Sequence, residues 1–559
     1  MTNVSSKVLF ITTSPRTPFR MISEIELLNT HFAGKKWNSE TQTAFMQFLR
    51  EENYFNGAGV NDPAFSARDR INRAPKALGF VTLSPVIGLT PAGQELIQSR
   101  RKEEIFLRQL LKFQLPSPYH KPTDQAAAFR VKPYLEIFRL IRHFGSLKFD
   151  ELMIFGLQLT DYRLFDSIIS KIEQFRISKI QTEQNYKSFR NESMTEELKM
   201  IYGKEIISGS TKTRESRDAS LAKFLQTKAS NMRDYADALF RYLRATGLVN
   251  ISHVGKSISI AQEKVQEVDY FLQHTDREPR FADDEKQYIA YLADPKIPQL
   301  LTDNKDLLID KIQNEFPHIK VDATYPISKL KDILYDEITK RKETIIDEQI
   351  TAIKDYRFYD DINVTFNQIT DKSLYDVPLM LEWNTWRAMT MLDGGQVTAN
   401  LKFDDFGNPM STAQGNMADI VCDYGDFGLT VEVTMQSGQR QYEMEGEPVT
   451  RHLAKLKKET GKPSYCLFIA PEINEACIAH FYALHKMNIS YYGGLSTIVP
   501  LPLNVFQKMV EDSCKASYIP QPQQVKRFFE RSNEIAATSV DEKIWYKKMT
   551  DIALNWLNY

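Results

Sequence analysis

Residues 415–452 read GNMADIVCDYGDFGLTVEVTMQSGQRQYEMEGEPVTRH. The β-rich runs ADIVCDY and LTVEVTM, joined by Gly-Asp-Phe-Gly, predict a β-hairpin. Asp419 opens the first strand and Glu432 lies in the second, thirteen residues later. Because side chains alternate along strands, a hairpin can bring one carboxylate from each strand to the same edge. Two hard oxygen ligands suit Mg²⁺, which keeps several waters and takes further bonds from a substrate phosphate.

The elements predicted around this hairpin follow the order of a known nuclease core. Upstream, residues 377–389 have helical spacing and carry Glu382, a possible third carboxylate. Downstream, Pro448 suits the first turn of a helix that would carry His452 one turn in. A buried strand, a helix and a strand near residue 498 come next. The order helix, hairpin, helix, strand, helix, strand is that of the α/β PD-(D/E)XK core.

The lysine of the PD-(D/E)XK motif is absent, because Thr434 stands two residues after Glu432. Taken by itself, an Asp and a Glu on a predicted hairpin are compatible with a metal-dependent phosphodiesterase. They are also compatible with solvated carboxylates that have no catalytic role. The pattern alone leaves both interpretations open.

The N-terminal half predicts winged-helix-like units in a mainly α-helical arrangement. After a short strand at residues 7–12 and a helix capped by Ser39, a basic helix carries Arg68 and Arg70. A strand, a turn, a strand and a capped helix follow it. The pattern returns about 168 residues later, near Thr246. Winged helices usually lay their second helix in the DNA major groove, although two helix–hairpin pairs can also look alike by chance.

Length and composition limit the classes of protein to which the chain can belong. Its 559 residues predict several domains, and its net charge of −1, from 71 basic and 72 acidic residues, neither favours nor excludes nucleic acid. The sequence lacks a long apolar run and a secretory signal, so we expect a cytoplasmic protein without a membrane partner. We expect the four cysteines to be reduced thiols. The expected divisions are two N-terminal subdomains, a linker and a C-terminal domain, at 1–125, 126–272, 273–301 and 302–559.

Several strings carry a resemblance over nearly the whole chain. In the N-terminal half they are Ser14-Pro15-Arg16, Phe65-Ser66-x-Arg68-Asp69-Arg70, and Arg233-Asp234-x-Ala236-Asp237-Ala238 with Arg241-Tyr242. In the C-terminal part they are Glu382-Trp383-x-Thr385-Trp386, Glu432-Val433-Thr434, Glu445-Gly446-Glu447-Pro448-Val449-Thr450-Arg451-His452 and Tyr465-Cys466-Leu467-Phe468-Ile469-Ala470-Pro471. With these strings the chain resembles the AlwI-like family of type IIS restriction and nicking endonucleases.

The resemblance implies a DNA-recognition half, a linker and a PD-(D/E)XK cleavage domain that uses Mg²⁺. The missing lysine is shared with the family, whereas Ala418 stands where a proline is common. We expect Asp419 and Glu432 to hold the metal. The implied catalytic residues are Glu382, Asp419, Glu432, Glu445 and His452. The expected DNA-binding residues are Arg16, Arg68, Arg70, Arg233 and Arg241.

The sequence therefore predicts an endonuclease that binds a short asymmetric duplex DNA site and hydrolyses phosphodiester bonds a few base pairs outside it. A strand-specific nickase, or the large subunit of a heterodimer with a small catalytic partner, is the alternative. A transient homodimer would be another route to cutting the second strand. A non-catalytic DNA-binding regulator is the competitor from another class. A cognate methyltransferase is the expected companion. Neither the recognition sequence nor the cleavage offset is readable from these residues.

Overall fold

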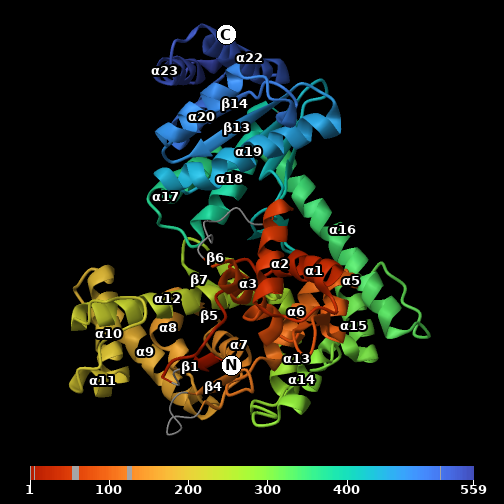
Figure 1. Ribbon diagram of the computed structural model, residues 1–559. Helices are drawn as coiled ribbons and strands as arrows, with labels where there is room; N and C mark the ends of the chain where they lie inside the picture. Colours follow the sequence, from red (N-terminus) through yellow and green to blue (C-terminus); the bar gives the residue numbers. More distant parts are fainter. Residues whose placement is uncertain are drawn as a thin grey trace. The chain divides into compact units, whose positions relative to one another are not determined.

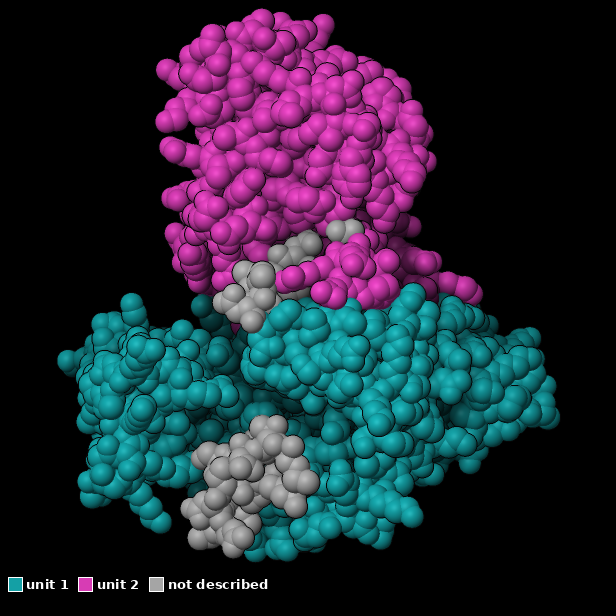
Figure 2. Space-filling view, in the orientation of Figure 1, with its two compact units in different colours: residues 1–46, 62–337 teal, residues 47–61, 338–559 magenta. Residues whose placement is uncertain are grey.

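The computed structural model describes residues 2–4, 7–52, 54, 62–122, 129–393, 395–516 and 518–558. The chain divides into two compact units (Figures 1 and 2). Unit 1 contains Met1–Met46 and Asp62–Glu337, and unit 2 contains Gln47–Asn61 and Ile338–Tyr559. Most of the described residues are helical, and the largest sheet lies in unit 2. The protein is therefore multidomain and mainly α-helical, as expected.

Unit 2 is built on a five-stranded mixed sheet. The strand order is β14-β13-β12-β11-β8. Strands β12, β13 and β14 run parallel, whereas β11 is antiparallel to both β12 and β8. The predicted hairpin is confirmed as the β11–β12 pair. The strand bounds are β8 Gln396–Ala399, β11 Ile420–Asp423, β12 Gly428–Val433, β13 Ser464–Ala470 and β14 Ile498–Pro502.

Helices cover both faces of this sheet, so its central strands are buried on both sides (Figure 1). Along β13, Leu467 and Ile469 pack into one hydrophobic cluster while Cys466 and Phe468 pack into the other. Such double burial explains why this strand is an unbroken apolar run. The helices of unit 2 are α16 Ile327–Lys354 (shared with unit 1), α17 Tyr359–Thr370, α18 Val377–Asp393, α19 Gln439–Thr460, α20 Glu475–Lys486, α21 Leu503–Lys515, α22 Pro522–Thr538 and α23 Glu542–Ala553.

One boundary in this unit differs from the prediction. Helix α19 begins at Gln439, so Pro448 lies inside the helix and His452 lies well beyond its first turn. A proline costs an interior helix one backbone hydrogen bond. Here Pro448 is itself buried against the unit, and tertiary packing overrides the local preference. Strand β8 and the short pair β9 Lys402–Phe403 and β10 Pro409–Ser411 were not predicted.

Unit 1 is mostly helical and contains two separate hairpins. The β2–β3 hairpin follows α3 and α4, and the β6–β7 hairpin follows α12 and pairs with β5. Both hairpins lie where the repeated pattern placed them, while the winged-helix assignment stays a prediction. The elements are β1 Thr2–Val4, α1 Arg20–Phe32, α2 Ser39–Glu51, α3 Pro63–Ile71, α4 Ala74–Ala77, β2 Val81–Thr82, β3 Gly88–Leu89, α5 Pro91–Gln98, α6 Lys102–Lys112, β4 His120–Pro122, α7 Pro133–Phe144, β5 Ser146–Lys148, α8 Phe149–Ile154, α9 Phe165–Gln181, α10 Tyr186–Ile201, α11 Gly203–Ile207, α12 Leu221–Arg244, β6 Val249–Ser252, β7 Ser257–Ile260, α13 Val265–His274, α14 Glu285–Ala293 and α15 Lys305–Glu315.

Two local predictions for unit 1 were wrong. Residues 7–12 form no strand, although Val8, Leu9 and Ile11 are buried as an apolar strand would be. The cap of α2 is Asn38 rather than Ser39, because the Asn38 side chain accepts a hydrogen bond from the Thr41 N–H at 3.0 Å.

Residues 273–301, expected to form a linker, belong to unit 1 and include helix α14. The buried Lys112 ammonium donates to the carbonyl oxygens of Leu292 and Asp294 at 2.9 and 2.6 Å. Buried hydrogen bonds of this kind fasten the segment to α6. The division of the chain into functional modules stays a prediction.

All four cysteines are free thiols. Across the described residues, none of the helices combines the length and the apolar character needed to span a bilayer.

Candidate functional site

Asp419 and Glu432 lie at the open end of the β11–β12 hairpin. The antiparallel register places Ile420 opposite Val431, so Asp419 and Glu432 form the next cross-strand pair. Side chains directly opposite one another in such a pair lie on the same face of the sheet. The Asp419 Oδ2 atom accepts a hydrogen bond from the Val433 N–H at 2.8 Å, and the Glu432 side chain is buried. The two carboxylates are therefore held close together, as the sequence predicted.

Helix α19 adds Glu445 and His452 to this pair. Burial raises the pKa of Glu432 well above its ordinary value, and the nearby Glu445 carboxylate raises it further. Burial also raises the pKa of Glu445. The Nδ1 atom of His452 lies 2.8 Å from Glu432 Oε1. These four side chains form what we call the carboxylate centre: Asp419, Glu432, Glu445 and His452.

His452 is neutral near pH 7, because burial lowers its pKa to about 4. The Nδ1 atom faces Glu432, so a neutral ring that donates from Nδ1 would leave Nε2 as an acceptor. Among the described residues, this buried Nε2 atom has no hydrogen-bond partner. A buried ring nitrogen without a partner lowers stability. Such an atom is suited to accept a hydrogen bond from water or from a bound substrate.

The donor set of the carboxylate centre fits Mg²⁺. Within the described parts of the chain, no group of three or more His, Cys, Asp or Glu side chains is arranged to hold a metal ion unaided. Mg²⁺ does not need such a cage, since it usually binds one or two carboxylates and completes its shell with water and phosphate. Burial and then the Glu445 charge raise the pKa of Glu432, and a bound cation would stabilise the charged carboxylates.

Glu382 lies on α18, and its Oε1 atom accepts a hydrogen bond from the Ala413 N–H at 2.7 Å. This bond fastens the carboxylate to the segment that leads into β11. Only 4% of Glu382 is exposed. The structure therefore gives Glu382 a positioning contact next to the segment that carries Asp419.

Two residues of this region were not among the predicted site residues. Arg451 donates from Nη1 to the Asn416 side-chain oxygen, and its charge opposes the rise in the pKa of Glu432. The Thr434 side chain hydrogen-bonds Glu445, and it occupies the position of the missing lysine. Both lie in strings that carry the family resemblance, but no spacing rule singled them out.

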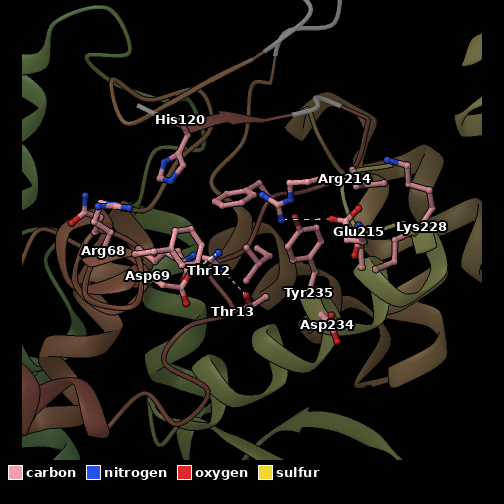
Figure 3. A pocket seen from close by; sticks show the side chains of 18 of the residues that line it. Thr12, Thr13, Arg68, Asp69, His120, Arg214, Glu215, Lys228, Asp234 and Tyr235 are labelled. Atoms are coloured by element: carbon pink, nitrogen blue, oxygen red, sulfur yellow. Dashed lines mark hydrogen bonds and ion pairs between the residues drawn. The ribbon is translucent and has the colours of Figure 1, made fainter. Parts of the chain in front are cut away.

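Unit 1 contains a cleft of about 740 Å³ (Figure 3). Its lining comes from six separate segments: residues 8–13, helix α3 with the turn after it, β4, the residue between α10 and α11, the connection between α11 and α12, and α12 itself. Cationic, acidic, amide and aromatic side chains all contribute to it. Among the charged ones are Arg68, Asp69, Arg73, Arg214, Glu215, Lys228 and Asp234.

The predicted DNA-binding arginines occupy different places around unit 1. Arg68 lines the cleft and donates to the Gln42 side-chain oxygen at 2.8 Å. Partial burial raises the pKa of Asp234, which also lines the cleft, and the charges of Arg233 and Arg16 oppose that rise. Arg16 and Arg233 are thus exposed cations beside the cleft.

The other two predicted arginines make ion pairs within unit 1. Arg70 pairs with Glu24, whose side chain is only 3% exposed. The Arg241 side chain is 7% exposed and pairs with Asp237 at 2.8 Å. Their assignment to DNA binding stays a prediction, but both guanidinium groups already have carboxylate partners.

A sequence comparison decides the family. The model of the AlwI restriction endonuclease family matches residues 76–509, well over half of the chain. The chain belongs to the AlwI restriction endonuclease family. This restriction endonuclease is accordingly a nuclease that binds and cleaves DNA, and the match covers the whole carboxylate centre. No curated protein sequence matches the chain.

Solved structures of other restriction endonucleases show a distant likeness. The small subunit of the heterodimeric restriction endonuclease R.BspD6I is 24% identical, with a TM-score of 0.29, over 36% of this chain and 96% of that one. The binding domain of the BpuJ1 endonuclease, in complex with modified DNA, is 13% identical, with a TM-score of 0.33, over 52% and 97%. Restriction endonuclease FokI is 11% identical, with a TM-score of 0.23, over 94% and 99%. At these scores the likenesses support no argument about the site.

Proposed function

We propose that this restriction endonuclease is a Mg²⁺-dependent type IIS enzyme. Unit 1 would bind a short asymmetric duplex site, and unit 2 would hydrolyse phosphodiester bonds a few base pairs outside it. The observation that carries the proposal is the carboxylate centre: two opposed carboxylates at a hairpin end, with a third carboxylate and a neutral histidine from one helix beside them. Unit 2 would then be a PD-(D/E)XK domain, and the hairpins of unit 1 would belong to winged-helix-like units.

The centre assigns a role to each side chain. Asp419 and Glu432 would hold Mg²⁺, which neutralises charge on the scissile phosphate when it is bound. Glu445 would orient or deprotonate the attacking water, since burial raises its pKa and makes it a stronger base than an exposed carboxylate. The free Nε2 atom of His452 would accept a hydrogen bond from water. The water oxygen bonds to phosphorus, the bond from phosphorus to the sugar oxygen breaks, and that sugar oxygen gains a proton.

The carboxylate centre also argues against a DNA-binding protein that has no catalytic activity. Burying carboxylates close together costs stability, because each loses water and repels the other. Glu432 and Glu445 both carry that cost, as their raised pKa values show. A regulator without catalytic activity would gain nothing from it, whereas a metal-dependent nuclease needs it.

Strand-specific nicking is the second candidate function. Unit 2 contains one carboxylate centre among its described residues, and one such centre cuts one strand at a time. Cutting the second strand would require a transient homodimer or a small catalytic subunit. In either case a cognate methyltransferase would protect the recognition site in the same system.

Cleavage mapping tests the proposal directly. Wild-type protein is incubated with plasmid and Mg²⁺, and the ends are mapped on each strand to give the site, the offset and the strand choice. Asp419→Asn should abolish cleavage and keep specific binding. Asp423→Asn is the matched control, since Asp423 ends the same strand as an exposed side chain that pairs with Lys462, and it should cut like wild type. Ca²⁺ in place of Mg²⁺ should allow binding without turnover.

Unimpaired cutting by Asp419→Asn would refute the assignment of the centre. Equal loss of cutting in the Asp419 and Asp423 variants would also refute it, because a general effect of charge removal would then explain the result. Site-specific cuts confined to one strand would favour the nicking function over double-strand cleavage.

A further inference from the structure

One face of helix α12 forms a wall of the unit 1 cleft (Figure 3). Lys228, Asn231 and Tyr235 line the cleft, and their spacing of three and four residues places them on the same side of the helix. The arginines near the end of α12 do not belong to this face, since Arg241 is paired and nearly buried. Of the two predicted DNA-binding arginines on α12, Arg233 lies within the half that lines the cleft and Arg241 lies outside it.

Two arginines from other segments converge on this wall. Arg73 follows α3, and Arg214 lies in the connection between α11 and α12. Burial raises the pKa of Tyr235, and the charges of Arg73 and Arg214 oppose that rise, so both guanidinium groups lie near the Tyr235 hydroxyl. Arg73 is held by Asp69 at 2.6 Å. The Arg214 side chain is 88% exposed and lies 3.6 Å from Glu215.

The composition of the cleft suits base edges as well as phosphates. A surface that only follows the sugar–phosphate backbone needs cations alone. Here an amide and acidic side chains stand among the cations, and these residue types read bases: Asn pairs bidentately with adenine, and Asp or Glu accepts from cytosine. Among the residues that the structure describes, the Asn231 amide makes no side-chain hydrogen bond. Its donor and acceptor are thus available to a ligand.

Lys228 and Arg214 suit phosphate instead. The Lys228 ammonium lies 4.9 Å from the centre of the Tyr202 ring, at the other end of the lining face from Tyr235. It is a point charge of the kind that binds phosphate without base selectivity. Arg214 is an exposed cation that, among the described residues, makes one ion pair, a long contact with its neighbour Glu215. A phosphate can replace that contact at little cost.

We propose that this cleft receives duplex DNA, with Asn231 against a base edge and with Arg214 and Lys228 against phosphates. The inference rests on the proposed function, because it names the surface by which unit 1 would bind the recognition site. None of these three residues was among the predicted DNA-binding arginines. In this assignment α12 carries Asn231, which contacts a base, and the connection before α12 carries Arg214, which binds phosphate.

The test measures binding of the full chain in Ca²⁺ by fluorescence anisotropy. The duplexes carry the site mapped with the wild-type enzyme, every single-base substitution of that site, and a scrambled sequence, each at two salt concentrations. Asn231→Ala should lose about 5- to 150-fold of discrimination at one base pair and change scrambled binding little. Arg214→Ala and Lys228→Ala should weaken cognate and scrambled binding alike, and each should lower the slope of log affinity against log salt by about one.

Arg217→Ala is the matched control. Arg217 lies three residues from Arg214 in the same connection and is exposed, but it does not line the cleft. Its substitution should leave affinity and salt slope unchanged. Melting curves of all four variants, compared with wild type, check that folding is retained.

The possible outcomes distinguish failure of the cleft proposal from failure of the proposed function. If Arg214→Ala behaves like Arg217→Ala and Asn231→Ala keeps full discrimination, while wild type still cuts at its site, the cleft proposal is overturned and the proposed function stands. If wild type neither binds nor cuts DNA site-specifically, both are overturned. Loss of discrimination in Asn231→Ala, together with a lower salt slope in Arg214→Ala, supports the cleft proposal.

Discussion

Replacing Arg70 by alanine should damage the fold of unit 1 rather than remove a DNA contact. Arg70 pairs with Glu24, and their side chains are 18% and 3% exposed. Removing one partner of a buried ion pair leaves an uncompensated charge and costs about 3–5 kcal/mol. The partial exposure of Arg70 places the expected loss near the lower end, about 3 kcal/mol. In a domain of this size, that corresponds to a fall of about 6 °C in the Tm.

The loss should also depend on pH, with a predictable sign. Burial raises the pKa of Glu24 above its ordinary 4.5, and Arg70 opposes that rise. Without Arg70 the folded-state pKa rises further, so the folded protein binds more protons than the unfolded chain from pH 4.5 upwards. The unfolding free energy of Arg70→Ala should therefore fall, relative to wild type, as pH rises towards 7. Below about pH 4.5 the difference should be smallest, since Glu24 is then neutral in both states.

Thermal melts at several pH values measure this effect. Two further variants give the limits between which the stability loss should lie. Arg68→Ala removes an exposed 3.9 Å pair with Asp62 and a 2.8 Å hydrogen bond to Gln42, and it should cost roughly 1–2 kcal/mol, less than Arg70→Ala. The double variant Glu24→Gln/Arg70→Met removes both charges and should recover much of the stability lost in Arg70→Ala. If Arg70→Ala melts like Arg68→Ala at pH 7 but loses DNA affinity, the structural role of Arg70 is wrong.

The remaining predictions concern packing and boundaries in unit 1. Gly93→Ala would place a Cβ atom 2.0 Å from a backbone carbonyl oxygen and should cost roughly 1–3 kcal/mol in a denaturant titration, whereas Gly203→Ala meets no atom within 4 Å and should be neutral or slightly stabilising. Equal melting of the two would contradict the packing argument. A fragment that ends at Asp276 loses the guanidinium partner of the fully buried Glu136 carboxylate. It should give a weaker cooperative melt than one that extends to Glu337, and the reverse ranking would place the boundary of unit 1 earlier.

Much of unit 2 was predictable from sequence because its signals are local. The Gly-Asp-Phe-Gly turn lies between two β-rich runs, and it predicted the hairpin together with the cross-strand neighbours Asp419 and Glu432. The apolar run around Phe468 predicted a strand buried on both faces. The start of α19 was missed because Pro448 is a good signal for a helix start, and only tertiary packing reveals that it lies inside the helix.

The sequence could not predict which side chains pair with one another in the folded protein. Arg68 and Arg70 lie two apart on one helix and have different partners: Arg68 lines the cleft and Arg70 pairs with Glu24. Which arginine does which depends on a carboxylate 46 positions away in the chain. The pairing of His452 with Glu432 likewise joins α19 to β12. The cleft itself draws on six separate segments, and no single stretch of sequence predicts it.

The discontinuous course of the chain matters for recombination between relatives. Among the described residues, 47–52 and 54 cluster with unit 2, although they precede most of unit 1 in the sequence. A single crossover near residue 337 would therefore exchange most of unit 2 and leave this short segment behind from the other parent. Hybrid enzymes that join one specificity to another cutting pattern would need two further exchanges, one at each end of 47–61. A single crossover between the two stretches of unit 2 thus always takes them from different parents, and only multiple exchanges keep both from the same ancestor.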